Sequence, residues 1–336
     1  MTGIGSGDAA LDRPAGSVWS MERRPLGGSG IQVGRIGLGC MPMDWGYFGR
    51  KKDDPGDVIA RALELGVNHF DTSDVYGPFT NEETVGRALD GRRDEAVIAT
   101  KVGLVVGPNG GYPLGKVGRP EHLREAVDAS LRRLRTDVID LYYLHRIDPE
   151  VPFEEQWSTL ASFVDAGKVR AIGLSEASID ELERAQAIHP VAALQSELSL
   201  WTRDAIENGI VAWCAGNGVA FVPFSPLGRG YLTGTVTTAD FAGLDFRIDN
   251  PRFQQEALDA NQAIVDVVRR VAERHDATAA QVALAWVLAR GEHVLPIPGT
   301  KRRRYLEENV AAASLELTAE DHAELDDLPE TIGTRY

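Results

Sequence analysis

Short apolar runs alternate with longer amphipathic stretches along almost the whole chain. Runs of about four to eight apolar residues, bounded by polar or turn residues, are typical of buried strands. Eight such runs predict eight strands, at residues 35–39, 68–72, 96–100, 140–144, 170–174, 192–196, 220–224 and 294–298.

The segments between these runs have the period of amphipathic helices. In residues 120–135 the apolar side chains recur three or four positions apart and form one stripe, and Pro120 suits the first turn of a helix. Residues 152–167 repeat the pattern and end in a glycine, as does the stripe in residues 58–66. A glycine at the end of such a stripe is typical of a helix C-terminus.

The alternation of strands and helices favours an α/β fold, a single (β/α)8 TIM barrel that spans residues 22–336. A doubly wound sheet alternates in the same way, but it usually shows G-x-G-x-x-G after its first strand, whereas residues 37–42 read GLGCMP. Residues 22–34 predict a β-hairpin ahead of the barrel. Residues 226–260 predict a long loop after the seventh strand that covers a ligand. The small, polar residues 1–21 predict a disordered tail.

Composition and charge narrow the class of protein. The chain has 336 residues, of which 43% are hydrophobic and 25% charged, so it can bury a large core without disulfides or metals. Its formal charge of −15 argues against binding to nucleic acids and to anionic membranes. Two cysteines, no secretory signal and no apolar run of about 20 residues predict a cytoplasmic protein. No pattern fixes an oligomeric state.

Polar residues stand where the predicted strands end, which is where (β/α)8 barrels have their active sites. These residues are Asp71 with Tyr76 beyond it, Lys101, His145, Ser175 with Glu176, Gln195, Ser225 and the run Gly299-Thr300-Lys301. A buried polar group costs free energy unless it has a partner, so their recurrence at one end of the barrel points to a site.

Lys101 is the most informative of these residues. The chain has six lysines against 29 arginines, yet a lysine directly follows the apolar run 96–100. A buried lysine needs an acidic partner, and Asp71 on the neighbouring strand is the candidate. An ammonium beside Tyr76 is expected to lower the pKa of the phenol and make it a better acid, while His145 donates a hydrogen bond to a substrate oxygen. None of these groups supplies a hydride, so a nicotinamide cofactor is expected.

Six ordered motifs resemble those of the aldo-keto reductase superfamily from about residue 22 onward. They are FDTSDVYG (70–77), ATK (99–101), YYLHRID (142–148), GLSEAS (173–178), FSPLGRGYLTG (224–234) and IPGTKRRRYLEEN (297–309). The motifs GLSEAS, QSELSLWTRD and SPLGRGYLTG look most like the branch of pyridoxal-reductase-like and perakine-reductase-like enzymes, which is similar to potassium-channel β-subunits. The resemblance implies NADPH-dependent, reversible reduction of a small aldehyde or ketone.

The resemblance also implies roles for particular residues. The catalytic set would be Asp71, Tyr76, Lys101 and His145, with Tyr76 as the general acid in reduction and the base in oxidation. The positions that match binding residues for NADPH or NADP+ are Cys40, Met41, Ser175, Glu176, Gln195, Phe224, Ser225, Pro226, Leu227, Gly228, Arg229, Gly230, Arg247, Gly299, Thr300, Lys301, Arg302, Glu308 and Asn309.

Within that set, Ser175 and Gln195 match the residues that hold the nicotinamide carboxamide, and Phe224 matches the ring that stacks on nicotinamide. Residues 225–230 match the loop along the pyrophosphate. Residues 299–309 match the segment around the 2′-phosphate and adenine. The basic run 301–304 could instead be a solvated helix face, but a helix N-terminus with adjacent cations favours a phosphate site.

The loops after the strands offer substrate-binding candidates, namely Trp45, Tyr47, Phe48, Arg146 and Trp201, together with Phe79 and the Gly-rich stretch 104–117. Several are aromatic, which suits bulky apolar carbonyl compounds, although ordinary packing would explain them too. No metal-ligand spacing occurs, so no metal site is expected.

Two further functions stay open. An NADP-binding regulatory or scaffold protein would bind the cofactor and turn over little. A (β/α)8 aldolase would use Lys101 as a Schiff-base amine.

Overall fold

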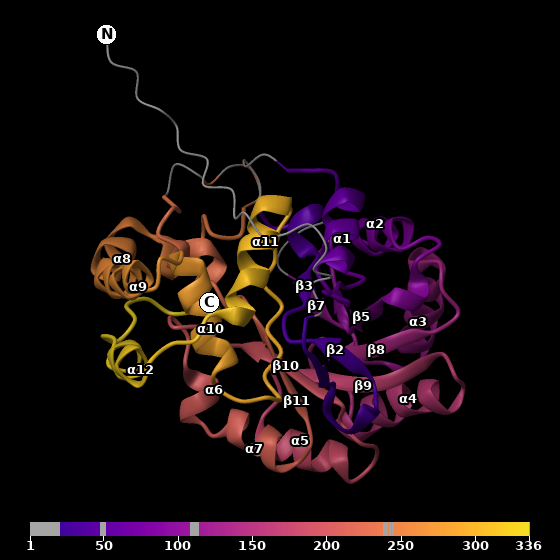
Figure 1. Cartoon of the computed structure of the whole chain (residues 1–336). Coiled ribbons are helices and arrows are strands. Elements are labelled where there is room, and N and C mark those ends of the chain that lie inside the picture. The colour runs from indigo at the N-terminus through magenta and orange to yellow at the C-terminus, as the bar shows by residue number, and fades with distance from the viewer. Residues whose placement is uncertain are drawn as a thin grey trace.

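Seven of the eight predicted runs form one parallel sheet. The computed structural model describes residues 21–47, 52–107, 114–237, 241, 243 and 245–335. The sheet has the order β11-β10-β9-β8-β5-β4-β3, so its neighbours follow one another along the chain as in a (β/α)8 barrel (Figure 1). The strands are β3 Leu38–Gly39, β4 His69–Asp71, β5 Val97–Val102, β8 Ile139–Leu144, β9 Val169–Ser175, β10 Ala193–Glu197 and β11 Ala220–Phe224.

The eighth run closes the barrel between β11 and β3, although isolated bridges are all that marks it as a strand within the described residues. The amides of Leu295 and Ile297 donate to carbonyls of β11, and the carbonyls of Pro296 and Pro298 accept from glycine amides at β3. Proline has no N–H to donate, so the hydrogen bonds toward β3 run in one direction. The predicted run is therefore in place, but its ladder is incomplete.

Helices follow the strands and cover the outside of the barrel (Figure 1). They are α1 Pro55–Glu64, α2 Thr80–Ala88, α3 Pro120–Leu134, α4 Phe153–Asp165, α5 Ile179–Gln186, α6 Asp204–Glu207, α7 Ile210–Gly216, α8 Gln255–Ala260, α9 Gln262–Arg274, α10 Ala279–Leu288, α11 Arg303–Ala311 and α12 Ala319–Asp326. The three stripes read from the sequence correspond to α1, α3 and α4, with Pro120 in the first turn of α3 as predicted. Among the described helices, none has the length and apolar character that a membrane span requires.

The predicted hairpin closes the N-terminal end of the barrel. Strands β1 Arg23–Pro25 and β2 Gln32–Gly34 pair antiparallel, and Leu26, Ile31 and Val33 pack with the inward side chains of the barrel. At Gly27, φ is +54° and a Cβ would lie 2.2 Å from the Ala192 carbonyl oxygen, so this turn needs glycine. With this end closed, the opposite end is left for a site.

The long segment after β11 is more ordered than a plain loop. It contains the 3-10 turns η4 Gly228–Thr233 and η6 Pro251–Phe253, followed by α8. The stretch after β5 holds a small antiparallel hairpin that sequence reasoning missed, β6 Leu104–Val105 and β7 Gly115–Lys116. Met21 packs against the core. The rest of the predicted tail, residues 1–20, lies outside the described residues.

Candidate active site

The predicted site residues continue the inward face of the barrel strands. Side chains alternate between the two faces of a strand, and Ala99 and Tyr143 belong to the cluster that fills the barrel. Lys101 lies two residues after Ala99, inside β5, and His145 lies two residues after Tyr143, directly after β8. The same alternation applies on the neighbouring strands to Ser175, Gln195 and Phe224. The barrel thus brings these side chains to its C-terminal end.

Lys101 is fully buried and binds three oxygen atoms. Its Nζ donates to Asp71 Oδ1 at 2.5 Å, to the Thr72 carbonyl at 2.7 Å and to Tyr76 Oη at 3.4 Å. The other carboxylate oxygen of Asp71 accepts from Gln195 Nε2 at 2.8 Å. Because a buried ammonium needs such partners, this cluster fixes the lysine beside the tyrosine hydroxyl.

Burial raises the pKa of the Tyr76 hydroxyl well above its ordinary value, and the Asp71 carboxylate raises it further. The sequence argument expected Lys101 to lower this pKa. That expectation was wrong for the net pKa, because loss of hydration of the phenolate and the nearby carboxylate outweigh the charge that lowers it, that of Arg146. Burial also lowers the pKa of Lys101, while Asp71 acts in the opposite direction. Tyr76 is consequently a protonated phenol at neutral pH, which is the form of a proton donor.

His145 lies edge-on to Tyr76, with 6.0 Å between the ring centroids and 84° between the planes. Burial lowers the pKa of His145 well below its usual value, and the charges of Lys101 and Arg146 lower it further, so the ring is neutral. Its Nδ1 lies 3.2 Å from the Ser73 hydroxyl oxygen. A neutral imidazole carries one N–H, so a hydrogen bond from Ser73 to Nδ1 would leave the proton on Nε2.

Ser175 and Gln195 stand opposite each other in the register of β9 and β10. Each already has a side-chain partner, because the Ser175 hydroxyl accepts from Arg146 Nη1 at 2.9 Å and Gln195 binds Asp71. The next residue, Glu176, accepts from the Glu197 amide at 3.0 Å. The two predicted carboxamide-binding residues are therefore adjacent, with Ser175 held by Arg146 and Gln195 held by Asp71.

Backbone strain gathers at the positions matched to the cofactor. Six described residues other than glycine have φ in the left-handed region, and three of them are Glu176 (56°), Ser225 (50°) and Arg229 (55°). Such conformations cost about 1–3 kcal/mol each and persist where the surroundings impose them, often at ligand sites. The strain singles out the same loops as the sequence motifs.

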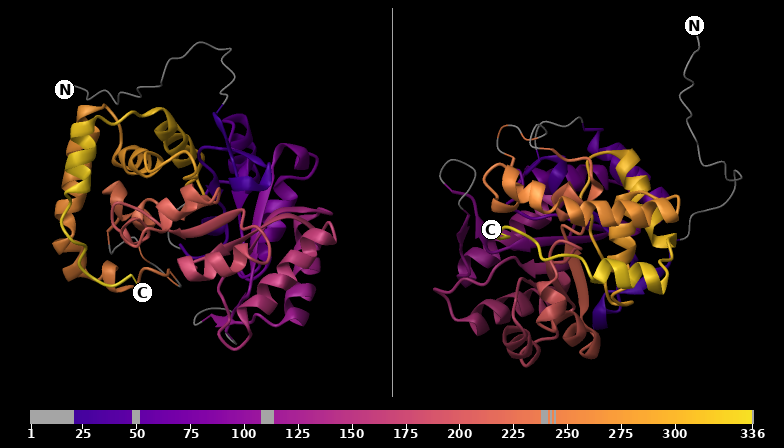
Figure 2. Two further views of the ribbon diagram at one scale, coloured as in Figure 1. Left: turned by 90° about the horizontal axis from the view of Figure 1, so that it is seen from below. Right: turned by 90° about the vertical axis from the view of Figure 1, so that its left-hand side faces the viewer.

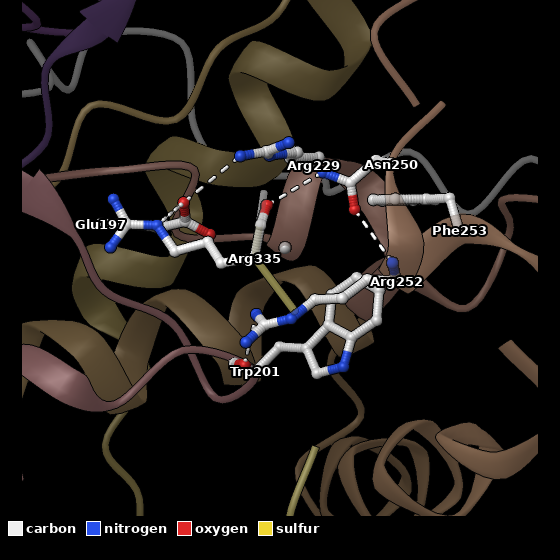
Figure 3. A pocket seen from close by; sticks show the side chains of 8 residues that line it. Glu197, Trp201, Arg229, Asn250, Arg252, Phe253 and Arg335 are labelled. Carbon is white, nitrogen blue, oxygen red and sulfur yellow. Dashed lines mark hydrogen bonds and ion pairs between the residues drawn. The ribbon is translucent and has the colours of Figure 1, made fainter. Parts of the chain in front are cut away.

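A cluster of charges lies beside these strained loops (Figure 3). Glu197 pairs with Arg229 at 3.4 Å and with Arg335 at 2.9 Å, and Arg335 also pairs with Glu176. The guanidinium carbon of Arg335 lies 5.8 Å from the centroid of the Phe224 ring. The yellow C-terminal segment runs beside the orange segment that follows β11 (Figure 2), and the Arg335 carbonyl accepts from Asn250, directly before η6, at 3.0 Å. Sequence reasoning did not connect residue 335 with the site.

The segment after β11 reaches across to the loop after β3. The Phe246 amide donates to the Gly46 carbonyl at 3.2 Å, and the Phe246 ring meets Trp45 at 4.8 Å. Arg247 lies over the Tyr47 ring at 5.0 Å. Since Trp45 is also 5.7 Å from the Tyr76 ring, this contact brings the segment after β11 next to Tyr76, and its role as a cover over a ligand stays a prediction.

The predicted phosphate site lies at the N-terminus of α11. Lys301 Nζ donates to the Tyr47 carbonyl at 2.6 Å, which ties this end to the loop after β3. Arg302 has a buried Nε with no hydrogen-bond partner in the described part of the chain. The Asp53 carboxylate accepts from the Arg303 amide at 2.9 Å. Glu308 and Asn309 lie further along the same helix.

The other predicted positions fall in three places. Trp201 is 3% exposed and stacks on Tyr231 at 4.3 Å, so it packs under the segment after β11 rather than lining the cluster around Tyr76. Cys40 and Met41 follow β3, and burial raises the pKa of the Cys40 thiol, as fits a packing residue. Phe48 lies outside the described residues, as does part of the Gly-rich stretch 104–117.

Sequence reasoning missed several supporting residues. The Thr72 hydroxyl donates to Asn81 Oδ1 at 2.6 Å, and Asn81 Nδ2 donates to the Cys40 carbonyl at 3.0 Å. These buried residues connect β3, the loop after β4 and α2 beneath Tyr76. Ser73 and Thr72 could have been found within the FDTSDVYG motif, as polar residues between Asp71 and Tyr76, but Asn81 carries no comparable signal.

Comparison with known proteins agrees with this geometry. The model of the Aldo/keto reductase family matches residues 35–330. The chain belongs to the aldo/keto reductase family. A probable aldo-keto reductase 1 from Glycine max is 44% identical over 303 residues, which are 89% of this chain and 86% of that protein. The aldo/keto reductases are oxidoreductases, so the predicted class of enzyme and the predicted (β/α)8 fold are confirmed.

Solved aldo/keto reductases have the same fold. The glycerol dehydrogenase AKR11B4 from Gluconobacter oxydans superposes with a TM-score of 0.82 at 30% identity, over 91% of this chain and 94% of that one. The holo form of the aldo-keto reductase AKR11C1 from Bacillus halodurans superposes with a TM-score of 0.75 at 26% identity, over 94% of this chain and 98% of that one. The narrower branch read from the motifs stays a prediction.

Proposed function

We propose that this aldo/keto reductase reduces aldehydes or ketones with NADPH, using Tyr76 as the general acid. The observation that carries the proposal is the bonded group of Asp71, Lys101 and Tyr76, with the neutral ring of His145 beside it. We also propose a cytosolic location, in keeping with two free, buried cysteines.

The residues around the barrel mouth fit NADPH. The buried, unpartnered Nε of Arg302 is a donor without an acceptor in the described part of the chain, and it lies at the N-terminus of α11 beside Lys301. A cation at a helix N-terminus favours a phosphate, here the 2′-phosphate. At the other end of the site, Ser175 and Gln195 offer a hydroxyl and an amide for the carboxamide. Phe224, half-buried, offers a ring for stacking.

NADPH, when bound, supplies the hydride that reduces the carbonyl carbon. Tyr76 donates its phenolic proton to the carbonyl oxygen, where negative charge develops. Lys101 hydrogen-bonds Tyr76 Oη and stabilises the phenolate that remains. Asp71 fixes the ammonium, and Gln195 fixes Asp71. His145, neutral, orients the carbonyl by donating an N–H.

The same contacts favour a reductase over a Schiff-base aldolase. A Schiff-base lysine must present a free amine to its substrate. The Lys101 ammonium instead points its hydrogens at Asp71, the Thr72 carbonyl and Tyr76. The raised pKa of Tyr76 keeps the phenol protonated at neutral pH, which is the form that reduction requires.

The test follows NADPH oxidation by the purified protein with aromatic aldehydes, α-dicarbonyls and pyridoxal, alongside Tyr76→Phe. We expect Tyr76→Phe to lower kcat by about 10²- to 10⁴-fold, because the general acid is lost. NADPH affinity, measured by quenching of protein fluorescence, should change little. Near-normal kcat in this variant would disprove the assignment of Tyr76. Tight NADPH binding by the wild type without turnover of any carbonyl compound would favour a regulatory protein instead.

A further inference from the structure

Arg146 differs from the other cations around the barrel mouth. Four of the others pair with a carboxylate, namely Lys101 with Asp71, Arg229 with Glu197, Arg247 with Asp245 and Arg335 with Glu176, while Lys301 and Arg302 belong to the proposed phosphate site. Arg146 is held by two neutral oxygens, the His145 carbonyl at 2.6 Å and the Ser175 hydroxyl at 2.9 Å. Within the part of the chain that the structure describes, no carboxylate lies within ion-pair distance of it.

The two sides of the Arg146 guanidinium are used differently. Both hydrogen bonds come from Nη1, so the edge formed by Nε and Nη2 binds no described residue. In Arg92 and Arg247 this same edge takes a carboxylate with two bonds of 2.7–2.8 Å. Neither nitrogen of that edge in Arg146 is a buried atom without a partner, so the edge reaches solvent. The Nε and Nη2 atoms of Arg146 are therefore available to bind a carboxylate with two hydrogen bonds.

The position of Arg146 separates it from the proposed cofactor phosphates. It follows β8, the fourth strand of the barrel counted from β3, whereas Lys301 and Arg302 follow the eighth run, on the opposite side of the barrel. Arg146 instead touches Ser175, at the nicotinamide end of the proposed site. Its charge also lowers the pKa of both Tyr76 and His145, so it acts on the groups that meet the substrate carbonyl.

We propose that Arg146 binds a carboxylate of the substrate, so that the preferred substrates are aldehydes or ketones that carry a carboxylate near the carbonyl group. This inference rests on the proposed carbonyl reduction. The open Nε–Nη2 edge of Arg146 receives the carboxylate in a bidentate ion pair while Tyr76 and His145 bind the carbonyl oxygen. The carboxylate takes no part in the chemistry and is unchanged in the product alcohol.

The test compares 4-formylbenzoate with methyl 4-formylbenzoate, which differ chiefly by one charge. The readout is the ratio of kcat/KM for the acid to kcat/KM for the ester, measured with NADPH in the wild type, Arg146→Gln and Arg146→Lys. We expect a ratio of about ten or more in the wild type. We expect Arg146→Gln to lower it about 10- to 100-fold, mainly through KM for the acid, and Arg146→Lys to lower it less. A ratio within each protein cancels any general loss of activity. Arg135→Gln, which changes an exposed arginine far from the motifs, is the matched control and should keep the ratio.

The outcomes separate this inference from the proposed function. A wild-type ratio near or below one, or a ratio that Arg146→Gln does not change, would overturn the role of Arg146 even if both aldehydes are reduced. If neither aldehyde is reduced, the proposed function fails for them. The site is then tested by calorimetry with 4-(hydroxymethyl)benzoate and the NADP+-loaded protein. Binding that Arg146→Gln weakens at least tenfold supports the carboxylate site, and equal binding or none by both proteins refutes it.

Discussion

Two buried carboxylates at opposite ends of the barrel strands bind their cations in different ways. Asp71 ends β4 and pairs with Lys101, whose side chain is 0% exposed. Asp140 stands near the start of β8 and pairs with Arg93 and Arg170, whose side chains are 26% and 53% exposed. Asp140 also accepts from the Ile98 amide at 2.9 Å, which joins β8 to β5.

The difference agrees with the proposed division between an ion pair that serves chemistry and one that serves the fold. At the Asp140 end the arginines keep part of their hydration and connect neighbouring strands, so the pair serves the fold. At the Asp71 end the cation gives up all contact with water, which costs more free energy than a partly solvated pair. That cost is explained by the position of the ammonium beside Tyr76. Burial of the cation itself, more than the ion pair, distinguishes the proposed catalytic end of the barrel.

The strongest test of this difference removes one member of the ion pair at each end of the barrel. Lys101→Met should lower kcat by about 10³-fold or more, because the phenolate of Tyr76 loses its stabilising ammonium. Asp140→Asn should leave kcat within about twofold but lower the free energy of unfolding by roughly 2–4 kcal/mol. Steady-state kinetics and urea unfolding of both variants measure the two effects. If Asp140→Asn lost activity as strongly as Lys101→Met, the two ends would not differ in role.

Cations at the mouth that lie away from Tyr76 should contribute to binding of the cofactor and not to proton transfer by Tyr76. Changing Lys301 and Arg302 together to alanine should weaken NADPH binding about 10- to 100-fold, because two cations beside the proposed 2′-phosphate are lost. NADH binding should change by about threefold or less. Fluorescence titration with both cofactors measures this, and equal losses for the two would place the 2′-phosphate elsewhere.

His69, two residues before Asp71, is a second buried titratable group on the same strand, and its burial makes stability depend on pH. Its ring is fully buried, neither nitrogen has a hydrogen-bond partner in the described part of the chain, and burial lowers its pKa to about 4. The folded protein therefore resists protonating a group that the unfolded chain protonates near pH 6.5. Stability is undiminished above that pH and falls by roughly 3 kcal/mol as the pH drops to about 4.

The test of His69 is urea unfolding between pH 7.5 and 4. His69→Leu should flatten the acid side of the stability curve, whereas a change at the half-buried His189 should not. A curve for His69→Leu that runs parallel to the wild type would show that other groups, such as the carboxylates, cause the whole acid loss.

The sequence predicted the barrel, and the meeting of the proposed catalytic residues at one end of it, for a physical reason. Strand runs buried on both faces leave continuous apolar signals, and a lone lysine or histidine at the end of such a run stands out. The motifs then fix the order of the strand ends. Polar contacts between residues far apart in the sequence leave no such signal, which is why the hydrogen bonds of Asn81 and the ion pair of Arg335 with Glu176 are not predicted.

Electrostatic balance was also beyond the sequence. The spacing placed Lys101, Asp71 and Tyr76 together, but the direction of the pKa shift of Tyr76 depends on how much water each group loses and on which oxygen each faces. The sequence also could not predict that Nε and Nη2 of Arg146 face solvent, because this depends on Nη1 being the nitrogen that binds Ser175. Placement could be read from the pattern, whereas burial and orientation needed the three-dimensional structure.

Ser73 offers the finest test of the catalytic end, because it acts through His145. Its hydroxyl lies 3.2 Å from His145 Nδ1 and can fix the tautomer that carries the proton on Nε2. Ser73→Ala should lower kcat about three- to tenfold and change the pH profile on its acid side, since the imidazole loses the partner of its neutral form. Ser73→Thr keeps the hydroxyl and should restore both. A loss of kcat in Ser73→Ala with an unchanged pH profile, or a failure of Ser73→Thr to restore activity, would mean that Ser73 serves packing and leaves the orientation of His145 to the fold.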